Sequence, residues 1–181
     1  MVGLGVDLEL AAISAALDAF DTLPDGVSLS INASPEAIVS GELSNRIDPR
    51  VVHRTIVEVT EHAKVADYDA LHNALAPLKA AGLRVAIDDA GAGYSGLQHI
   101  IQLAPDIIKL DMSLTRGIDR DPALRALVTA MMYYARETGA IVVAEGIEMA
   151  SEMQALRRLG VHRGQGYLLG KPGPLAVPLA A

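Results

Sequence analysis

The sequence has 181 residues, of which 51% are hydrophobic and 20% are charged, a balance that suits one folded domain and excludes a disordered chain. The formal net charge of -7 gives no basic surface for phosphate backbones, so DNA and RNA polymers are not expected partners. There are no cysteines, which excludes disulfides and thiolate metal sites. The sequence shows no leader and no membrane segment, so a cytoplasmic location is expected.

Short β-branched runs alternate with amphipathic stretches along the chain. Residues 7–20 predict a first helix, and the apolar runs predict six strands. These strand predictions cover residues 27–32, 55–59, 83–88, 107–111, 141–145 and 166–169. Most of the runs are continuously apolar, which is typical of parallel strands buried on both faces.

Three further helices are predicted from residues that commonly start and stop helices. Each has a capping residue before an apolar periodic stretch and a glycine after it. The signals are Asp67 with Gly82, Asp121 and Pro122 with Gly139, and the capping-box pair Ser151 and Gln154 with Gly160. Regular alternation of strand and helix indicates an α/β fold, either an open doubly wound sheet or a closed (β/α) barrel.

Polar residues at the carboxyl ends of the predicted strands favour the barrel, because a barrel brings all those ends to one rim. They are Asn32, Glu58, Asp88, Asp89, Lys109, Asp111, Glu145 and Glu148, and Gln165 precedes the last strand. Adjacent aspartates repel each other unless a cation or an exposed turn relieves the repulsion. The pair Asp88 and Asp89 therefore favours a metal site.

Each of the other groups also has an ordinary structural explanation. Asn32 could cap the next helix, Glu58 and Glu61 could be a strand-end charge and a cap partner, and Lys109 could pair with Asp111. Glu145 and Glu148 could cap a helix. Taken together, oxygen ligands without a histidine pattern suit hard cations such as Mg²⁺, Mn²⁺ or Ca²⁺. Two such ions joined by a carboxylate are typical of phosphodiester hydrolysis, and a nearby lysine can stabilise charge.

Six segments resemble, in order, the motifs of the EAL-type cyclic di-GMP phosphodiesterases of bacterial signalling. They are SINAS, EVTE, DDAGAGYSGL, IKLD, AEGIE and GQGYLLGKP, spread over nearly the whole chain. The resemblance implies a TIM-type (β/α) barrel that hydrolyses cyclic di-GMP to linear pGpG with two Mg²⁺ or Mn²⁺ ions, Ca²⁺ being inhibitory. It also implies cyclic di-GMP as ligand, a homodimer, and an upstream sensor or cyclase domain as partners.

The resemblance further implies a role for each matching residue. The metal ligands would be Asn32, Glu58, Asp88 and Asp89, with Asp88 bridging the two ions. The catalytic group would be Lys109 at the nucleophilic water, Glu145 positioning or activating it, Glu61 bracing the loop after Asp89, and Gln165 near metal-bound water or ligand. Asp111, Glu148, Gly91 and Gly93 would support the site.

Two features depart from the family pattern. Ala90, Ala92 and Gly96 replace the family's Phe, Thr and Ser in a loop that couples the metal site to a dimer contact. In addition, no Glu-Ala-Leu segment occurs in the sequence, although in the family its Glu is a metal ligand and a nearby arginine holds the substrate phosphate. Because a TIM barrel needs about 250 residues, residues 1–181 are expected to form an N-terminally truncated EAL-type domain with six of eight strands and weak or absent hydrolysis.

Two other functions remain open from the sequence. One is a catalytically inactive module that binds cyclic di-GMP or only a partner protein. The other is a barrel enzyme that uses Lys109 to form a Schiff base, which the surrounding acids disfavour because they keep a lysine protonated.

Overall fold

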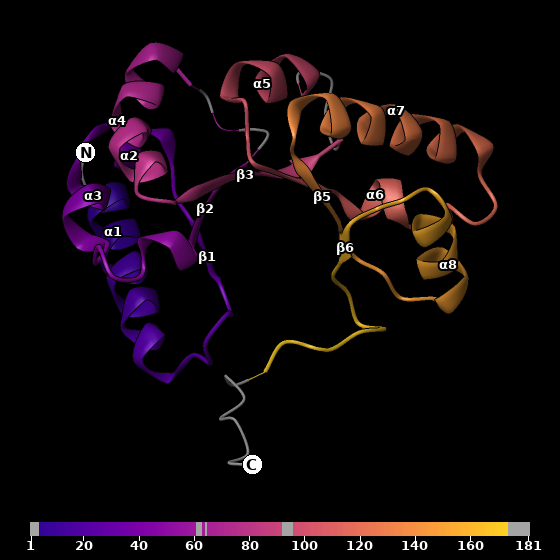
Figure 1. Cartoon of the computed structure of the whole chain (residues 1–181), viewed down its shortest axis with the longest axis horizontal. Helices are drawn as coiled ribbons and strands as arrows, with labels where there is room; N and C mark the ends of the chain where they lie inside the picture. The colour runs from indigo at the N-terminus through magenta and orange to yellow at the C-terminus, as the bar shows by residue number, and fades with distance from the viewer. Residues whose placement is uncertain (1–3, 61–62, 64, 92–95, 174–181) are drawn as a thin grey trace. The chain divides into compact units, whose positions relative to one another are not determined.

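The computed structural model describes residues 4–60, 63, 65–91 and 96–173. Its strands form a six-stranded sheet in chain order, β1-β2-β3-β4-β5-β6 (Figure 1). The contacts divide the chain into two units, residues 1–85 with 173–181 and residues 86–172. None of the helices within the described ranges has both the length and the apolar character that crossing a membrane requires.

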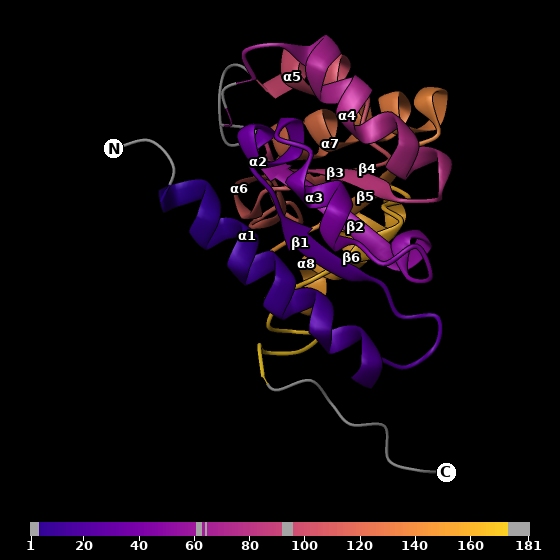
Figure 2. The same ribbon diagram turned by 90° about the vertical axis from the view of Figure 1, so that its left-hand side faces the viewer.

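The first unit consists of helices packed along one parallel strand pair. In chain order its elements are α1 (Leu4–Leu17), η1 (Asp18–Thr22), β1 (Leu29–Asn32), α2 (Pro35–Val39), α3 (Glu42–Arg46), η2 (Val52–Arg54), β2 (Thr55–Thr60) and α4 (Tyr68–Ala80). β1 pairs with β2 from Leu29 opposite Thr55 to Asn32 opposite Glu58. Figure 2 shows α1 beside β1, where Leu10 and Ile13 are buried.

The second unit contains a parallel ladder with helices between its strands. Its elements are β3 (Arg84–Ala90), which begins at the end of the first unit, α5 (Gly96–Leu103), β4 (Ile107–Leu110), α6 (Met112–Thr115), α7 (Pro122–Thr138), β5 (Ile141–Ala144), α8 (Ala150–Arg158) and β6 (Arg163–Gly164). β4 pairs with β3 and β5, and β5 pairs with β6, all in parallel. Ile87, Ile108 and Val142 are completely buried in these strands, as the apolar runs predicted.

Two of the predicted helix starts are confirmed. The Asp67 carboxylate accepts a hydrogen bond from the Ala70 N–H at 3.0 Å and begins α4. Asp121 accepts from the Ala123 N–H at 2.7 Å and begins α7, which ends at Gly139. These ends could be predicted because the capping group and its partner are two or three residues apart in sequence.

Two predicted elements near the C-terminus are wrong. The capping box is not Ser151 with Gln154, because the cap of α8 is Met149, two residues earlier, and it is Glu152 that accepts from the Met149 N–H, at 3.0 Å. The strand at 166–169 is a turn, closed by hydrogen bonds from the N–H groups of Leu169 and Gly170 to the carbonyl of residue 166. The ladder instead uses residues 163–164, because these lie in register with β5.

Candidate active site

A bulge at the end of β3 places the two adjacent aspartates. Ile87 lies opposite Ile108 and Ala90 opposite Leu110, so β3 carries one extra residue and both Asp88 and Asp89 face the single residue Lys109. On a regular strand, neighbouring side chains would point to opposite faces. Asp89 also has a positive φ of 58°, a conformation that aspartate tolerates better than most residues. The bulge and this backbone conformation allow both carboxylates to reach one site.

Lys109 on β4 lies between two carboxylates that come from different strand ends. Its Nζ is 2.8 Å from Asp88 Oδ1 and 2.9 Å from Glu145 Oε1. The three side chains are only 12–17% exposed, so their charges interact more strongly than those of surface pairs. Two neighbouring carboxylates stabilise the ammonium form of the lysine, which cannot attack a carbonyl, and this argues against Schiff-base chemistry.

Three carboxylates converge around this lysine. Oxygens of Asp88, Asp89 and Glu145 all lie within 4.8 Å of one another. Such a group of hard oxygen donors fits a divalent cation such as Mg²⁺, Mn²⁺ or Ca²⁺. Glu145 is held at the end of β5 by its N–H, which donates to the Leu110 carbonyl at 3.1 Å.

The loop that follows Glu145 is held by a second acidic residue, Glu152. This side chain is 4% exposed and accepts hydrogen bonds from the N–H groups of Gly117, Glu148 and Met149 at 3.0, 3.2 and 3.0 Å. Glu148 itself pairs with Arg116. Glu148 is therefore not the helix cap that the sequence left open, but it helps to fix the loop. Sequence reasoning missed Glu152, because Met149 has no side-chain oxygen and therefore does not complete the Ser/Thr-x-x-Glu pattern of a capping box.

Asp111 caps α6 and does not pair with Lys109. Its Oδ1 accepts from the Ser113 N–H at 2.9 Å. Partial burial raises the pKa of the Asp111 carboxyl, but hydrogen bonds from Ser113 and Met112 and the charge of Arg116 outweigh it, so the pKa lies below its ordinary value. The predicted ion pair between Lys109 and Asp111 is wrong, because β3 and the end of β5 supply closer carboxylates to the lysine.

Gly91 and Gln165 lie next to this cluster along the chain. Gly91 follows the bulge, and a Cβ there would lie 2.3 Å from Leu114 Cδ1. Gln165 follows β6 and bonds through its backbone to the Ala144 carbonyl at 2.8 Å and to the Ile147 N–H at 3.1 Å, on either side of Glu145. Within the described ranges the Gln165 side chain is exposed and makes no hydrogen bond or ion pair. Glu61 and Gly93 lie outside the described residues.

The first unit has a separate polar pocket at the ends of β1 and β2. It encloses about 410 Å³ and is lined by Glu9, Asn32, Ser34, Glu36, Glu58 and Thr60 among others. Glu58 is buried, at 7% exposure, and its carbonyl accepts from the Ala33 N–H at 2.9 Å. Asn32 is not the cap of α2. That role belongs to Ser34, whose Oγ accepts from the Ala37 N–H at 3.2 Å, and Asn32 thus stays available for a ligand.

Glu9, on α1, is a pocket residue that the sequence did not single out. Its carboxylate accepts hydrogen bonds from both the N–H and, at 2.7 Å, the hydroxyl of Ser34. Glu9 and Ser34 are 25 residues apart, so no local spacing could reveal the pair.

Comparison with known proteins decides the family. The model of the EAL domain family matches residues 2–172. The chain belongs to the EAL domain family. The resemblance seen in the sequence motifs is thus confirmed, and so is the TIM-type α/β fold, since solved EAL domains superimpose on nearly the whole chain.

The chain has curated relatives that are named as cyclic di-GMP phosphodiesterases. The chain is 36% identical over 126 residues to the bifunctional diguanylate cyclase/cyclic di-GMP phosphodiesterase MucR of Pseudomonas aeruginosa, covering 70% of this chain and 18% of the relative. It is 31% identical over 160 residues to the probable cyclic di-GMP phosphodiesterase PdeA of Escherichia coli, covering 83% and 22%. The chain thus spans about a fifth of the length of these curated relatives.

Solved EAL structures agree with the fold. The PaMucR phosphodiesterase in complex with c-di-GMP has a TM-score of 0.81 at 28% identity, covering 96% of this chain and 80% of that chain. A manganese and cyclic di-GMP complex of Klebsiella pneumoniae BlrP1 has a TM-score of 0.77 at 30% identity, covering 92% and 45%.

Proposed function

We propose that this EAL chain is a metal-dependent phosphodiesterase domain that hydrolyses cyclic di-GMP to linear pGpG. The observation that carries the proposal is the convergence of Asp88, Asp89 and Glu145 oxygens within 4.8 Å, with Lys109 paired to two of them. Relatives at 31–36% identity are named as cyclic di-GMP phosphodiesterases, and solved relatives hold cyclic di-GMP with manganese or calcium.

The donor set fits two divalent cations. Asp88 and Asp89 would serve as ligands in the second unit, and Asn32 and Glu58 are the ligand candidates in the first unit. All four offer carboxylate or amide oxygens, which Mg²⁺ and Mn²⁺ prefer. When bound, such cations stabilise the negative charge that develops on a phosphodiester during cleavage.

Lys109 and Glu145 would orient and deprotonate the attacking water. The Glu145 carboxylate can accept a hydrogen bond from the water and take its proton, because its backbone N–H is bonded to Leu110 and holds it at the end of β5. Lys109 orients the water and balances the charge of Asp88 and Glu145. In the same proposal Glu61 would brace the loop after Asp89, and Gln165 would lie near the ligand or a water molecule. Asp111, Glu148 and Gly91 would keep the surrounding turns in place.

We further propose that hydrolysis by these 181 residues alone is weak. Their sequence contains no Glu-Ala-Leu segment, so the ligand that the family takes from it is not supplied by this chain. Fewer ligands lower the affinity for the metal, and with it the fraction of molecules able to react.

The proposal is tested by incubating the chain with cyclic di-GMP and Mn²⁺ and separating the products by chromatography. We expect slow formation of pGpG that Asp88→Asn lowers at least about 100-fold, since it removes a charge needed in the transition state. The control is Glu137→Gln, which changes a side chain of 56% exposure on α7. Product formation that Asp88→Asn leaves unchanged would refute the proposal.

A binding measurement separates the enzyme from the inactive module. Calorimetric titration with cyclic di-GMP in Ca²⁺ reports binding without turnover. Tight binding in Ca²⁺ combined with no product in Mn²⁺ or Mg²⁺ would favour a receptor of the nucleotide over an enzyme.

A further inference from the structure

The C-terminal part of the sequence contains basic but no acidic side chains. All 22 acidic residues lie at or before Glu152, although the last 29 residues still carry four basic side chains. These are Arg157, Arg158, Arg163 and Lys171. In a protein of net charge -7, a C-terminal stretch of only positive charges is a local attraction for anions.

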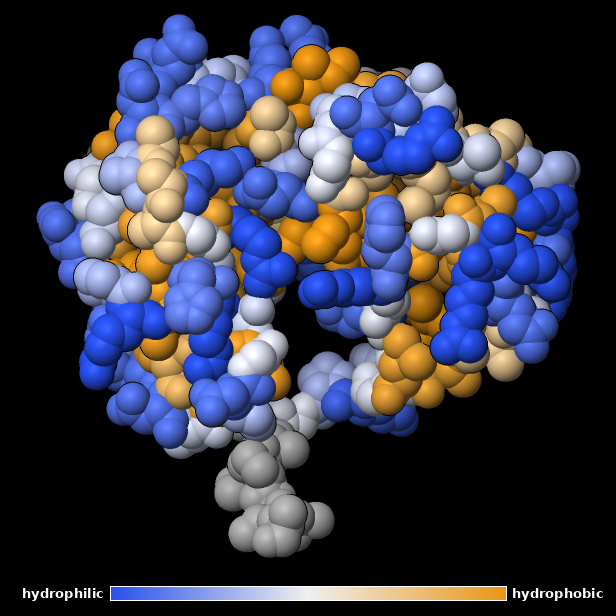
Figure 3. Space-filling model, in the orientation of Figure 1, coloured by the Kyte–Doolittle hydropathy of each residue, from blue (hydrophilic) through white to orange (hydrophobic). Residues whose placement is uncertain are grey.

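Apolar surface accompanies these charges. Tyr167, Leu168 and Leu169 are all exposed. Figure 3 shows an apolar patch, at the lower right, in the area where Figure 1 draws the segment after β6. Positive charge beside exposed apolar surface is the combination that an amphiphilic anion recognises.

A cavity lies within this stretch, between α8 and β6. It encloses about 160 Å³. Its apolar lining consists of Ile147, Met153, Leu156, Val161 and Leu169. An apolar cavity of about 150 Å³ is large enough for a benzene-sized molecule.

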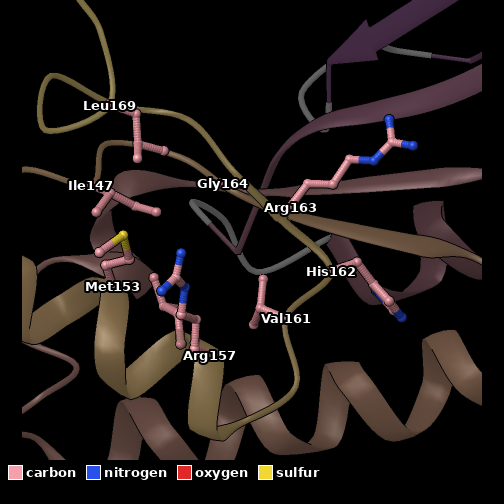
Figure 4. A pocket seen from close by; sticks show the side chains of 9 residues that line it. Ile147, Met153, Arg157, Val161, His162, Arg163, Gly164 and Leu169 are labelled. Carbon is pink, nitrogen blue, oxygen red and sulfur yellow. The ribbon is translucent and has the colours of Figure 1, made fainter.

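Three residues with side-chain nitrogens line the cavity: Arg157, His162 and Arg163. Figure 4 shows the Arg157 guanidinium between Met153 and Val161, whereas the Arg163 side chain points away from both. The Arg157 side chain makes no hydrogen bond or ion pair with any residue that the structure describes. A guanidinium beside an apolar wall can bind a carboxylate or phosphate through two parallel hydrogen bonds.

We propose that this cavity binds a small amphiphilic anion, a carboxylate or phosphate monoester with a short apolar chain. The apolar chain fills the space beside Ile147, Met153 and Leu156, and the head group pairs with Arg157. The site is separate from the cluster around Lys109 and does not depend on hydrolysis of cyclic di-GMP.

A position near the end of a helix could by itself explain a basic residue, because cations there interact favourably with the helix dipole. Arg157 and Arg158 both lie in the last turn of α8, so this explanation applies equally to both. Of these two arginines, Arg157 lines the cavity and Arg158 does not. Arg158 is therefore a matched control for charge and for helix stability.

The experiment is calorimetric titration of the full chain with hexyl phosphate, with inorganic phosphate and hexan-1-ol as separate titrants. We expect hexyl phosphate to bind more tightly than either half-molecule. Arg157→Gln should weaken it at least about tenfold, as expected for loss of a charge-assisted hydrogen bond. Val161→Phe should also weaken it by filling the cavity, while Arg158→Gln should change it less than about twofold.

Three results would overturn the proposal. Equal weakening by Arg157→Gln and Arg158→Gln would show a general basic surface. Binding of inorganic phosphate as tight as that of hexyl phosphate would show that the apolar lining takes no part. Binding to phosphatidylglycerol vesicles without binding of free hexyl phosphate would identify a membrane surface instead. Thermal unfolding of each variant confirms that it is folded.

Discussion

Two acidic sites, one in each unit, hold their carboxylates in different ways. In the second unit Asp88 and Glu145 share one ammonium group, that of Lys109, at 2.8 and 2.9 Å. In the first unit Glu9 is held by the neutral N–H and hydroxyl of Ser34. Asp88 and Glu145 thus depend on a charged partner, whereas Glu9 depends on hydrogen bonds to neutral donors.

This difference predicts that a bound metal stabilises the second unit more than the first. Removing a charged partner leaves partly buried carboxylates that repel each other, which costs more than losing hydrogen bonds to neutral donors. A bound cation could replace the missing positive charge in the second unit. It has no comparable effect on the pair of Glu9 and Ser34.

The largest effect is expected from Lys109→Met. Without metal, we expect the free energy of unfolding to fall by about 3 kcal/mol, because Asp88 and Glu145 lose their partner. Added Mn²⁺ should restore more stability to the variant than it adds to the parent chain. Urea denaturation with and without Mn²⁺ measures both values, and Lys109→Arg, which keeps the charge, is the control. Equal stabilisation of variant and parent by Mn²⁺ would contradict the idea that cation and lysine replace each other.

The next effect is a difference of about 2 kcal/mol between two glycine variants, which separates steric overpacking from backbone strain. Gly91 in the second unit and Gly41 in the first have φ values of 101° and 78°. A Cβ at Gly91 would lie 2.3 Å from a side-chain atom of the buried Leu114, whereas nothing lies within 4 Å of one at Gly41. We expect Gly41→Ala to cost about 1 kcal/mol from strain alone and Gly91→Ala about 3 kcal/mol from strain and overpacking.

Denaturant titration of the two glycine variants measures the difference. Leu114→Ala in the Gly91→Ala background should recover part of the loss relative to Leu114→Ala alone. If Gly91→Ala costs no more than Gly41→Ala, the packing described for the end of β3 is incorrect.

A moderate effect is expected in the first unit. Glu9→Ala should lower the free energy of unfolding by about 1–2 kcal/mol, since it removes the acceptor of two hydrogen bonds. A double-mutant cycle with Ser34→Ala should give a coupling energy of about 1 kcal/mol. Additive losses would mean that the two residues do not interact in solution.

The smallest effect is a pH dependence from Asp111. Its pKa is lowered in the folded state, so its contribution is fully present above the unfolded pKa of about 3.9 and is lost as the pH falls through the folded value. Asp111→Asn should therefore lower the free energy of unfolding by less than about 1 kcal/mol at pH 7, and the difference from the parent should shrink as the pH falls below about 3.9. Urea denaturation across this range tests it, and a difference independent of pH would argue against the α6 cap.

The sequence by itself determined the family, the α/β class, five of the strands in outline and the starts of α4 and α7. These features depend on neighbours in the chain. Asp67 and Asp121 each cap an N–H two or three residues later, and the apolar runs are buried wherever they fold. The sequence also indicated Asp88, Asp89, Lys109 and Glu145 as site residues, because charged side chains at the ends of buried apolar strands are unfavourable unless they are paired or bind a ligand.

Only the tertiary structure decided how those charges are paired. The bulge in β3 turns Asp88 and Asp89 toward one site, and Lys109 pairs with Asp88 and Glu145 instead of Asp111. In the first unit, Glu9 contacts Ser34. Each of these arrangements joins segments that are distant in sequence. The same holds for β6, whose position is set by register with β5 and not by its own apolar pattern. Side chains respond to the nearest opposite charge or donor in space, and the fold alone fixes which groups those are.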